Sequence, residues 1–479
     1  MKILLYAEPT TIIETPYPQS DVIKNHLYTW VAKNLLVVPN VEVKIVVPEI
    51  VYIQNTLFNH ITNVDLVEFK DEYLLDIFSN SLSIQEMFLK IFNNELLEDE
   101  YKKFNNIIKN ILPDFKPDIV IDFQIHNQLL RYAYPNALHM LVENGLFSRP
   151  PFPRTLRYEP IHFLNGFLNK YENEIRNFHI TNEQKKLVQN FKQNLRTVIN
   201  ANNKKGDILK ELKMKYRYLL LCPIPADNLY KETKYNDQYL YLLDILNKIP
   251  SDIGLIITFH DDCSSQLSAG IVKTLQEKYK NLIYFPVEDN AYVSQSLDFF
   301  EYCDAIINMH TMTGTQAMLW DLKVISMDKR YSKWFCDKQG LDNIVEFLSE
   351  PTKDKSNMIY WYMTHFCVFE HSMQKPNWYY NYFKNKLESY RQKGISFDLF
   401  EQVEDFDNIA EYIIDYVKNY YIKTNIKPEI NTIQEIPLPE PTFLQQIFSV
   451  KNEEVHKVIR ILGFKIKFKR KLKTKTINS

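Results

Sequence analysis

Short apolar runs that alternate with helix-length segments restrict the fold of this chain more than any other feature. They occur in two series, one within residues 2–142 and one within 217–325. Runs of roughly four to eight apolar residues between polar residues are typical of buried strands. Strands that alternate with helices favour a doubly wound α/β fold. The sequence therefore predicts two Rossmann-like domains in tandem that face each other across a cleft.

Breaks in this pattern divide the chain into four parts. Two long α/β parts are followed by aromatic-rich stretches at 358–391 and 406–420, which we expect to be helical with no strand between them. Residues 148–160 include four prolines and are expected to be irregular. The four parts are an N-terminal α/β domain (1–205), a second α/β domain (206–350), C-terminal helices that pack back on the first domain (351–426), and a proline-rich linker with a basic tail (427–479). The expected strands are 2–7, 41–47, 117–122 and 137–142 in the first domain, and 217–222, 254–259, 282–285, 304–309 and 324–325 in the second.

The scarcity of glycine excludes several classes of nucleotide-binding protein. Nine glycines among 479 residues leave no Gly-x-Gly-x-x-Gly segment and no Walker A loop. There is also no Gly-x-Ser-x-Gly elbow and no His-Glu-x-x-His pair. Dinucleotide dehydrogenases and P-loop kinases are therefore disfavoured. A phosphate site in this chain must use hydroxyls, a helix dipole and cationic side chains.

Charge and cysteine content indicate which partners and covalent or metal links to expect. The formal net charge is −2, so the molecule as a whole is not a polyanion binder, and we expect no nucleic-acid partner. The five cysteines form no Cys-x-x-Cys pair, which favours reduced thiols over a disulfide framework or zinc site. We expect neither a metal nor a cofactor.

The first candidate site is the threonine loop, residues 310–315, between an expected strand and an expected helix. A loop at the carboxyl end of a parallel strand that opens a helix is where α/β proteins bind phosphate. A glycine there lets a ligand approach the backbone. The structural alternative is an ordinary helix start with a threonine cap. The residues that this loop offers are His310, Thr311, Thr313, Gly314 and Thr315.

A second candidate lies at the end of the expected strand 254–259. His260 can contact a phosphate oxygen there as a donor or a cation. The alternative is that His260 caps the following helix, with Asp261 and Asp262 interacting favourably with the helix dipole. Two adjacent acids also fit Mg²⁺, but the pattern is too common to predict a magnesium site.

Two further candidates lie in the first domain. Glu143 stands at a strand end beside Gly145, which suits a general base that deprotonates a hydroxyl. Its alternative is a turn carboxylate or an ion-pair partner of Arg149 or Arg154. Glu8, behind the first strand, lies in what is otherwise an ordinary β–α loop.

These residues carry a resemblance to a family. The segment from Val142 to Pro150, closing with Tyr158-Glu-Pro160, resembles the Glu-x-Gly, Arg-Pro and Thr-Leu-Glu motifs of bacterial capsule polysaccharide synthesis proteins. Those proteins are GT-B glycosyltransferases, several of which transfer Kdo from CMP-Kdo. The threonine loop resembles the Ser/Thr-rich loop with which they and bacterial GT-B sialyltransferases hold the CMP phosphate. His260 falls where the family has a His-Pro motif, and residues 220–223 resemble the strand and loop that open its nucleotide-binding domain.

The resemblance covers residues 115–330 in patches, and it departs from the family at two points. Asp261 replaces the proline of His-Pro, and Asp321-Leu-Lys323 replaces Gly-Lys-Pro. These departures leave the donor open between CMP-Kdo, the first expectation, and another nucleotide sugar.

The resemblance implies a glycosyltransferase of the GT-B type that acts on a polysaccharide or glycolipid acceptor. The second domain would hold the nucleotide sugar through its phosphate, and Glu143 would activate the acceptor hydroxyl from the first domain. Two alternatives stay open: a GT-B nucleotide-sugar epimerase, and a non-catalytic sugar- or nucleotide-binding protein. The implied catalytic residues are Glu143 and His260, the latter on the phosphate. The implied nucleotide-sugar-binding residues are Pro223, His310, Thr311, Thr313, Gly314 and Thr315, and the acceptor-side residues are Glu8, Arg149 and Arg154.

The basic tail predicts a location. Residues 455–475 contain nine Lys or Arg and no acid, and their apolar residues fall on one face of a helix. A basic amphipathic helix is typical of a membrane-surface anchor. The alternatives are a disordered solvated tail and a nucleic-acid contact. Because the N-terminus reads as a strand and not as a signal peptide, we expect a cytoplasmic protein, peripheral on the inner face of the plasma membrane.

Overall fold

The computed structural model divides the chain into two compact units, Met1–Lys423 and Thr424–Ser479. Each unit is considered by itself. The structure describes the chain except residues 11–23, 59–60, 124–126, 163, 226–233, 236, 260–266, 286–295, 310, 426–447, 453–455, 462–463 and 470–479.

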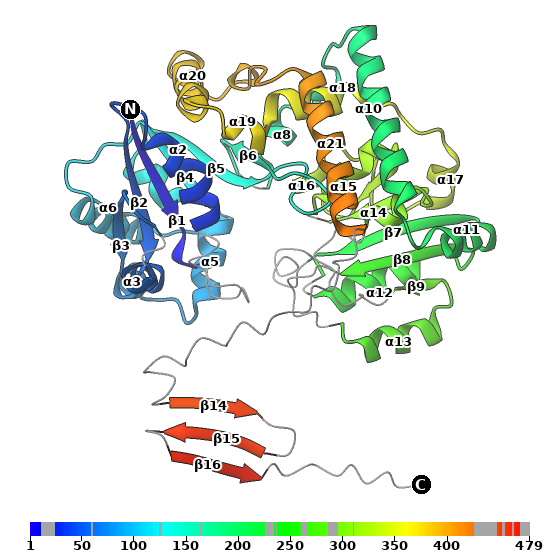
Figure 1. Ribbon diagram of the computed structural model, residues 1–479, viewed down its shortest axis with the longest axis horizontal. Helices are drawn as coiled ribbons and strands as arrows, with labels where there is room; N and C mark the ends of the chain where they lie inside the picture. Colours follow the sequence, from blue (N-terminus) through cyan, green and yellow to red (C-terminus); the bar gives the residue numbers. More distant parts are fainter. Residues whose placement is uncertain are drawn as a thin grey trace. The chain divides into compact units, whose positions relative to one another are not determined.

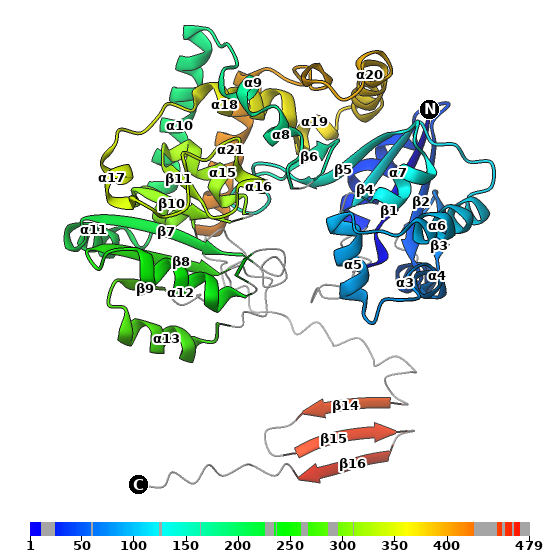
Figure 2. The ribbon, with the colours of Figure 1, turned by 180° about the vertical axis from the view of Figure 1, so that it is seen from behind.

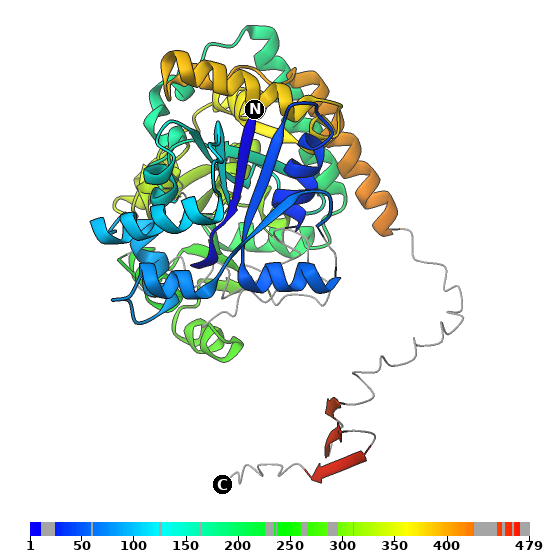
Figure 3. The same ribbon diagram turned by 90° about the vertical axis from the view of Figure 1, so that its left-hand side faces the viewer.

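The first sheet has seven strands in the order β13-β6-β5-β4-β1-β2-β3 (Figures 1 and 3). Strands β1 to β5 run parallel, whereas β6 is antiparallel to β5 and β13 is antiparallel to β6. All five residues of β4 are buried, as expected of a strand with helices on both faces. The strands are β1 (Lys2–Ala7), β2 (Glu42–Pro48), β3 (Asp65–Phe69), β4 (Ile119–Phe123), β5 (Leu138–Asn144), β6 (Thr155–Glu159) and β13 (Cys367–Phe369).

Helices connect these strands, and their ends follow capping rules. Ser83 caps α5 by accepting a hydrogen bond from the Glu86 amide, and α5 ends at Asn94 in the left-handed conformation. The helices are η2 (Lys24–Ala32), α2 (Lys33–Leu35), α3 (Glu49–Phe58), α4 (Asp71–Ile77), α5 (Ile84–Asn93), α6 (Glu98–Ile111) and α7 (Gln128–Ala133).

The second sheet has six parallel strands in the order β12-β11-β10-β7-β8-β9. Its strands are β7 (Tyr218–Ile224), β8 (Ile253–Phe259), β9 (Leu282–Tyr284), β10 (Ala305–Asn308), β11 (Lys323–Ser326) and β12 (Lys338–Gln339). Its helical segments are α11 (Gly206–Lys215), α12 (Gln238–Lys248), α13 (Ala269–Lys278), α14 (Leu297–Phe300), α15 (Thr313–Ala317), η4 (Met318–Trp320), α16 (Lys329–Ser332) and α17 (Ile344–Ser349).

Two mainly parallel sheets covered by helices confirm the predicted pair of Rossmann-like domains. Two such domains make up the GT-B fold. In each sheet the strand order reverses at one point, between β1 and β4 and between β7 and β10. Open α/β sheets bind ligands outside the carboxyl ends of the strands at such a point. The fold therefore marks two places for a site.

Helices after β6 and after residue 350 join the two sheets. Figure 2 shows α10, α18 and α21 gathered together, and the Phe191 ring of α10 lies 5.8 Å from that of Phe406 in α21. Near the first sheet the Tyr158 hydroxyl donates to the Tyr379 hydroxyl at 3.1 Å. The elements are α8 (Phe167–Lys170), α9 (Glu172–Arg176), α10 (Asn182–Ala201), α18 (Ser356–Trp361), η5 (Tyr362–Phe366), α19 (Glu370–Met373), α20 (Trp378–Lys393), η6 (Phe397–Leu399) and α21 (Phe406–Asn425).

Two local predictions were wrong. Strand β6 lies inside the segment expected to be irregular, because the β-prone run Thr155 to Tyr158 extends the first sheet after its prolines. Strand β13 interrupts the predicted helix 358–391, where Val368 pairs with Leu156 of β6. In both cases antiparallel strand pairing outweighs the local signal.

The second unit is an antiparallel sheet of β14 (Phe448–Asn452), β15 (His456–Ile461) and β16 (Phe464–Lys469). The amphipathic helix expected for the basic tail is therefore wrong over these strands. Residues from Phe464 to Lys469 alternate apolar and basic, which is the period of a strand rather than of a helix. Among the described residues, no helix is both long and apolar enough to span a bilayer.

Buried and exposed valines give a test of this core. Val120 in β4 is fully buried, whereas Val37 is 77% exposed. We expect Val120→Ala to lower the free energy of unfolding by on the order of 2 kcal/mol, because it removes buried methyl groups and leaves a cavity. Val37→Ala should change it by about 0.5 kcal/mol or less. Urea denaturation followed by tryptophan fluorescence measures both, and equal effects would contradict the placement of β4.

Candidate functional site

The threonine loop lies at the point where the second sheet reverses its strand order. Strand β10 ends at Asn308, and Thr313 begins α15. The Thr311 hydroxyl accepts a hydrogen bond from the Thr313 amide at 3.0 Å, which closes a tight turn before the helix. Pro223 is buried near the end of β7, the strand on the other side of the reversal. The sequence-predicted residues Thr311, Thr313 and Pro223 thus occupy the strand ends that the fold marks.

Gly314 is required by close packing. A β-carbon added there would lie 2.6 Å from the Cγ of Asn308, so a side chain would collide with that amide. Asn308 is fully buried, and neither its Oδ1 nor its Nδ2 has a hydrogen-bond partner within the part of the chain that the structure describes. A buried amide is normally satisfied, so Asn308 is a site candidate that the sequence analysis missed. The available signal was a polar residue that ends an apolar strand.

Glu143 lies at the carboxyl end of β5, and its Oε1 accepts a hydrogen bond from the Asn144 amide at 2.6 Å. The residue opposite it in β6 is Arg157, whose side chain is 4% exposed. Burial alone would lower the pKa of Arg157, but Tyr331, Tyr362 and Glu143 raise it above its ordinary range. Arg157 was not among the predicted residues. It could have been found from the strand register, once β6 was recognised.

Contacts join this region to the threonine loop. The Arg157 guanidinium lies 5.7 Å from the ring centroid of Tyr331 in α16. The Tyr331 hydroxyl donates to the sulfur of Met312, within the loop, at 2.6 Å. A second link runs from Gln316 Nε2 of α15 to the carbonyl of Leu146, at 2.9 Å. The structure therefore brings the neighbourhood of Glu143 and the threonine loop together.

The backbone carbonyls of the two predicted arginines accept hydrogen bonds from the C-terminal helices and from the loop before β6. The carbonyl of Arg154 accepts from the Glu370 amide of α19 at 3.3 Å, and the Arg154 charge opposes the rise that burial causes in the pKa of Glu370. The Arg149 carbonyl accepts from the Phe152 amide at 3.1 Å. Glu143 stands opposite Arg157 in the strand register, and its charge is among those that raise the pKa of Arg157. The alternative that pairs Glu143 with Arg149 or Arg154 stays a prediction.

Glu8 lies at the reversal point of the first sheet and is 1% exposed. It accepts hydrogen bonds from the Thr10 amide at 3.2 Å, the Thr10 hydroxyl at 3.0 Å, and the Asn127 side-chain amide. Asp122 of β4 accepts from the Asn127 backbone amide at 3.0 Å. Burial raises the pKa of Glu8 to about 7 and that of Asp122 to about 8. Asp122 and Asn127 were not predicted, because the strand was treated as core alone.

Several predicted residues lie outside the described part of the chain. These are His260, His310 and the pair Asp261 and Asp262. Thr258, just before them, is buried and its hydroxyl lies 3.0 Å from that of Ser296. The roles of the two histidines, and of the other predicted site residues, stay predictions.

A pocket of about 400 Å³ lies elsewhere, along α10. It includes none of the predicted site residues. Its lining residues are Gln189, Lys192, Gln193, Arg196, Thr197, Asn200, Glu301 and Asp321.

Known proteins resemble this chain in structure only distantly. No protein-family model matches the sequence, and no curated protein matches it. The beta Kdo 2,7 transferase of KpsC from Thermosulfurimonas dismutans is 11% identical, with a TM-score of 0.34, over 60% of this chain and 89% of that one. UDP-GlcNAc 2-epimerase from Neisseria meningitidis, bound to UDP-GlcNAc, is 13% identical with a TM-score of 0.27, over 88% of this chain and 100% of that one. A third similar structure is the glycotransferase of kitacinnamycin, 10% identical with a TM-score of 0.30, over 75% and 93% of the two chains. At these values the likeness carries no argument about activity.

The buried carboxyl groups predict a pH dependence of stability. Because the folded-state pKa of Asp122 is raised to about 8, the folded chain binds more protons than the unfolded chain between the ordinary carboxyl range and pH 8. Stability should therefore fall as pH rises through this window. In Asp122→Asn, which cannot ionise, the fall in melting temperature between pH 5 and pH 8 should be smaller than in the wild type. Thermal unfolding at both pH values measures it, and an equal or larger fall in the variant would contradict the assignment.

Proposed function

We propose that this chain is a glycosyltransferase that moves a sugar from a nucleotide donor to a hydroxyl of a surface polysaccharide or glycolipid. CMP-Kdo or a related CMP-sugar is the first donor to test. One observation supports the proposal most. Contacts through Arg157, Tyr331 and Met312 connect the end of β5, where Glu143 lies, with the threonine loop after β10. A transferase needs a base for the acceptor and a grip for the leaving nucleotide in the same place.

On the nucleotide side, threonine hydroxyls at the start of a helix would bind the phosphate in place of a glycine-rich phosphate-binding loop. Thr311 and Thr313 would donate to the phosphate oxygens, and Gly314 would keep the start of α15 packed closely against Asn308 beside them. His260 and His310 would add donors or positive charge, and Pro223 would border the nucleotide from β7. Stabilising the charge of the departing phosphate is the main electrostatic requirement of such a transfer.

On the acceptor side, Glu143 would accept the proton of the attacking hydroxyl. Its carboxylate is fixed by the Asn144 amide and faces a buried cation across the strand pair. Arg149 and Arg154, which lie in the loop between β5 and β6, would contact the acceptor. Glu8 is 1% exposed, so it would support the acceptor side from within the first domain without touching the acceptor. No metal or cofactor is part of this proposal.

Substitution of the proposed base tests the catalytic step. We expect Glu143→Gln to lower the transfer rate by about 10²–10⁴-fold, because the amide cannot accept the proton, while nucleotide affinity changes little. Mass spectrometry of products formed from CMP-Kdo and a glycan acceptor measures the rate. The control Glu42→Gln, at an exposed position of β2, should behave as wild type.

Three outcomes would contradict parts of this proposal. Normal turnover by Glu143→Gln would exclude its role as base. Conversion of the donor without any acceptor would indicate an epimerase, and donor binding with no conversion under either condition would indicate a binding protein.

We also propose an anionic membrane surface as a partner of the basic tail, with the chain peripheral on the inner face of the plasma membrane. The support is the charge of the segment, and it does not depend on a helix. Each basic residue near an anionic surface contributes about 1 kcal/mol. Nucleic acid is not the proposed partner.

Vesicle binding tests this partner. Deletion of residues 443–479 should release the protein from vesicles that contain phosphatidylglycerol, measured by co-sedimentation at low and high salt. The full-length triple variant Lys465→Gln, Lys467→Gln, Lys469→Gln should bind more weakly than wild type, since three charges are lost. Unchanged binding by both would refute the membrane role.

A further inference from the structure

The segment that follows the threonine loop ends at a residue with an unusual backbone. Helix α15 runs directly into η4, and η4 ends at Asp321, whose φ of 55° lies in the left-handed region. Glycine adopts this conformation most easily, and Asp or Asn is the next choice. Because this backbone conformation favours glycine, the contacts of the Asp321 side chain are the place to look for the reason that an aspartate stands here.

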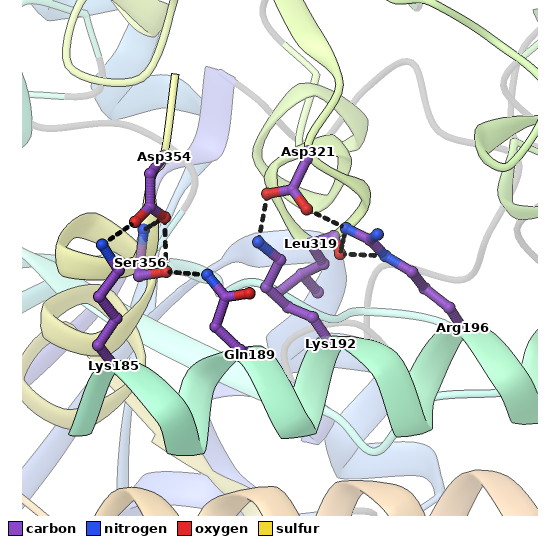
Figure 4. A network of polar contacts seen from close by, with 8 residues as sticks. All are labelled: Lys185, Gln189, Lys192, Arg196, Leu319, Asp321, Asp354 and Ser356. Atoms are coloured by element: carbon purple, nitrogen blue, oxygen red, sulfur yellow. Dashed lines mark hydrogen bonds and ion pairs between the residues drawn. The ribbon is translucent and has the colours of Figure 1, made fainter. Parts of the chain in front are cut away.

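The side chain of Asp321 is held by two cations of one helix face (Figure 4). Its Oδ1 pairs with Lys192 Nζ, and its Oδ2 lies 2.6 Å from Arg196 Nη2. Arg196 also donates twice to the carbonyl of Leu319, through Nε at 2.8 Å and Nη2 at 2.6 Å. One carboxylate and one carbonyl at the end of η4 are therefore fixed by side chains of α10.

Helix α10 is a firm support for these contacts. It starts with a capping box in which Thr181 and Gln184 exchange hydrogen bonds. The side of α10 next to these two cations buries Val188, Phe191, Leu195 and Ile199. The Lys192 side chain is only 3% exposed, so loss of its carboxylate would leave a buried ammonium without that counter-charge.

The loop and Asp321 are connected by a short, buried piece of chain. Every residue from Gly314 to Trp320 is buried, and no break separates α15 from η4. At the loop end Gly314 is wedged against Asn308, and Gln316 is bonded to the Leu146 carbonyl. A piece so confined moves as a unit, and a shift at Asp321 therefore shifts the threonines.

We propose that Asp321 is a positioning residue: by docking on Lys192 and Arg196 it fixes the α15–η4 segment and thereby sets the place of the threonine loop. It acts from behind the loop and touches no substrate. The consequence for nucleotide affinity rests on the proposed function, whereas the consequence for loop order does not.

The same helix face supplies a matched control. Lys185, seven residues before Lys192, pairs at 2.6 Å with Asp354, whose side chain is 39% exposed against 38% for Asp321. Asp354 leads into α18 instead of the threonine loop (Figure 4). Removal of its charge costs an ion pair on α10 without releasing the α15–η4 segment.

Hydrogen–deuterium exchange with mass spectrometry on the full-length protein tests the proposal. Asp321→Asn tolerates the left-handed backbone but loses the charge, so amides of residues 311–320 should exchange about tenfold faster or more. Asp354→Asn should leave that peptide at the wild-type rate. Asp321→Gly, which relaxes the backbone, should resemble Asp321→Asn. Should Asp321→Asn not fold, Arg196→Gln should raise exchange in the same peptide.

A second readout is calorimetric titration with CMP, where Asp321→Asn should bind about tenfold more weakly than wild type and Asp354→Asn equally well. Wild-type protection of residues 311–320 in Asp321→Asn, or equal loss of protection in Asp354→Asn, would overturn the proposal. So would restored protection in Asp321→Gly. If wild type binds no CMP but exchange separates the two variants as expected, the proposed function loses support while the positioning role stands.

Discussion

The buried guanidinium of Arg157 is the group on which the arrangement of the site depends. A cation with 4% exposure needs partners, because the cost of removing a charge from water is recovered only through nearby acids, hydrogen bonds or aromatic faces. Arg157 finds these partners in two domains: Glu143 opposite it in the first sheet, and Tyr331 in α16 of the second. Arg157 therefore connects the end of β5 with α16. Through Tyr331 this connection continues to Met312 in the threonine loop.

The two points where the sheets reverse their strand order differ in the side chains that they carry. At the first, Glu8 and Asp122 are enclosed by Thr10 and Asn127, and burial raises the pKa of both acids. At the second, the threonine loop carries hydroxyls and a glycine, and the buried amide of Asn308 lies directly against it. One point is a self-contained acidic cluster, and the other offers donors beside a strand end. The second suits an anionic ligand better.

Much of the fold could be predicted from the sequence, because buried parallel strands are continuous apolar runs. The run 2–7 coincides with β1, and the expected strands at 217–222 and 254–259 became β7 and β8 with small shifts. The two antiparallel strands were missed: β6 directly follows a proline-rich segment, and the edge strand β13 is only three residues long and pairs with β6, which is far away in the sequence. The prediction for the basic tail was wrong for another reason. Its alternating apolar and basic residues fit a strand, but its high charge led us to expect an amphipathic helix.

The site could be predicted only in part. Strand ends pointed to Glu143, Glu8 and the threonine loop without knowledge of the sheet order. Arg157 depends on the register of an unrecognised strand, and the dock of Asp321 on Lys192 joins residues 129 positions apart, which no local pattern encodes.

The central claim is that the threonine loop holds a nucleotide phosphate. Calorimetric titration of the wild type and Thr313→Val with CMP, UDP, GDP and ADP tests it most directly, because the substitution removes one hydroxyl with little change of shape. The account predicts that one nucleotide, CMP first, binds the wild type and binds Thr313→Val about 10-fold to 100-fold more weakly, the effect of one hydrogen bond to a charged group. Binding of none of the four, or equal binding to both proteins, would contradict it.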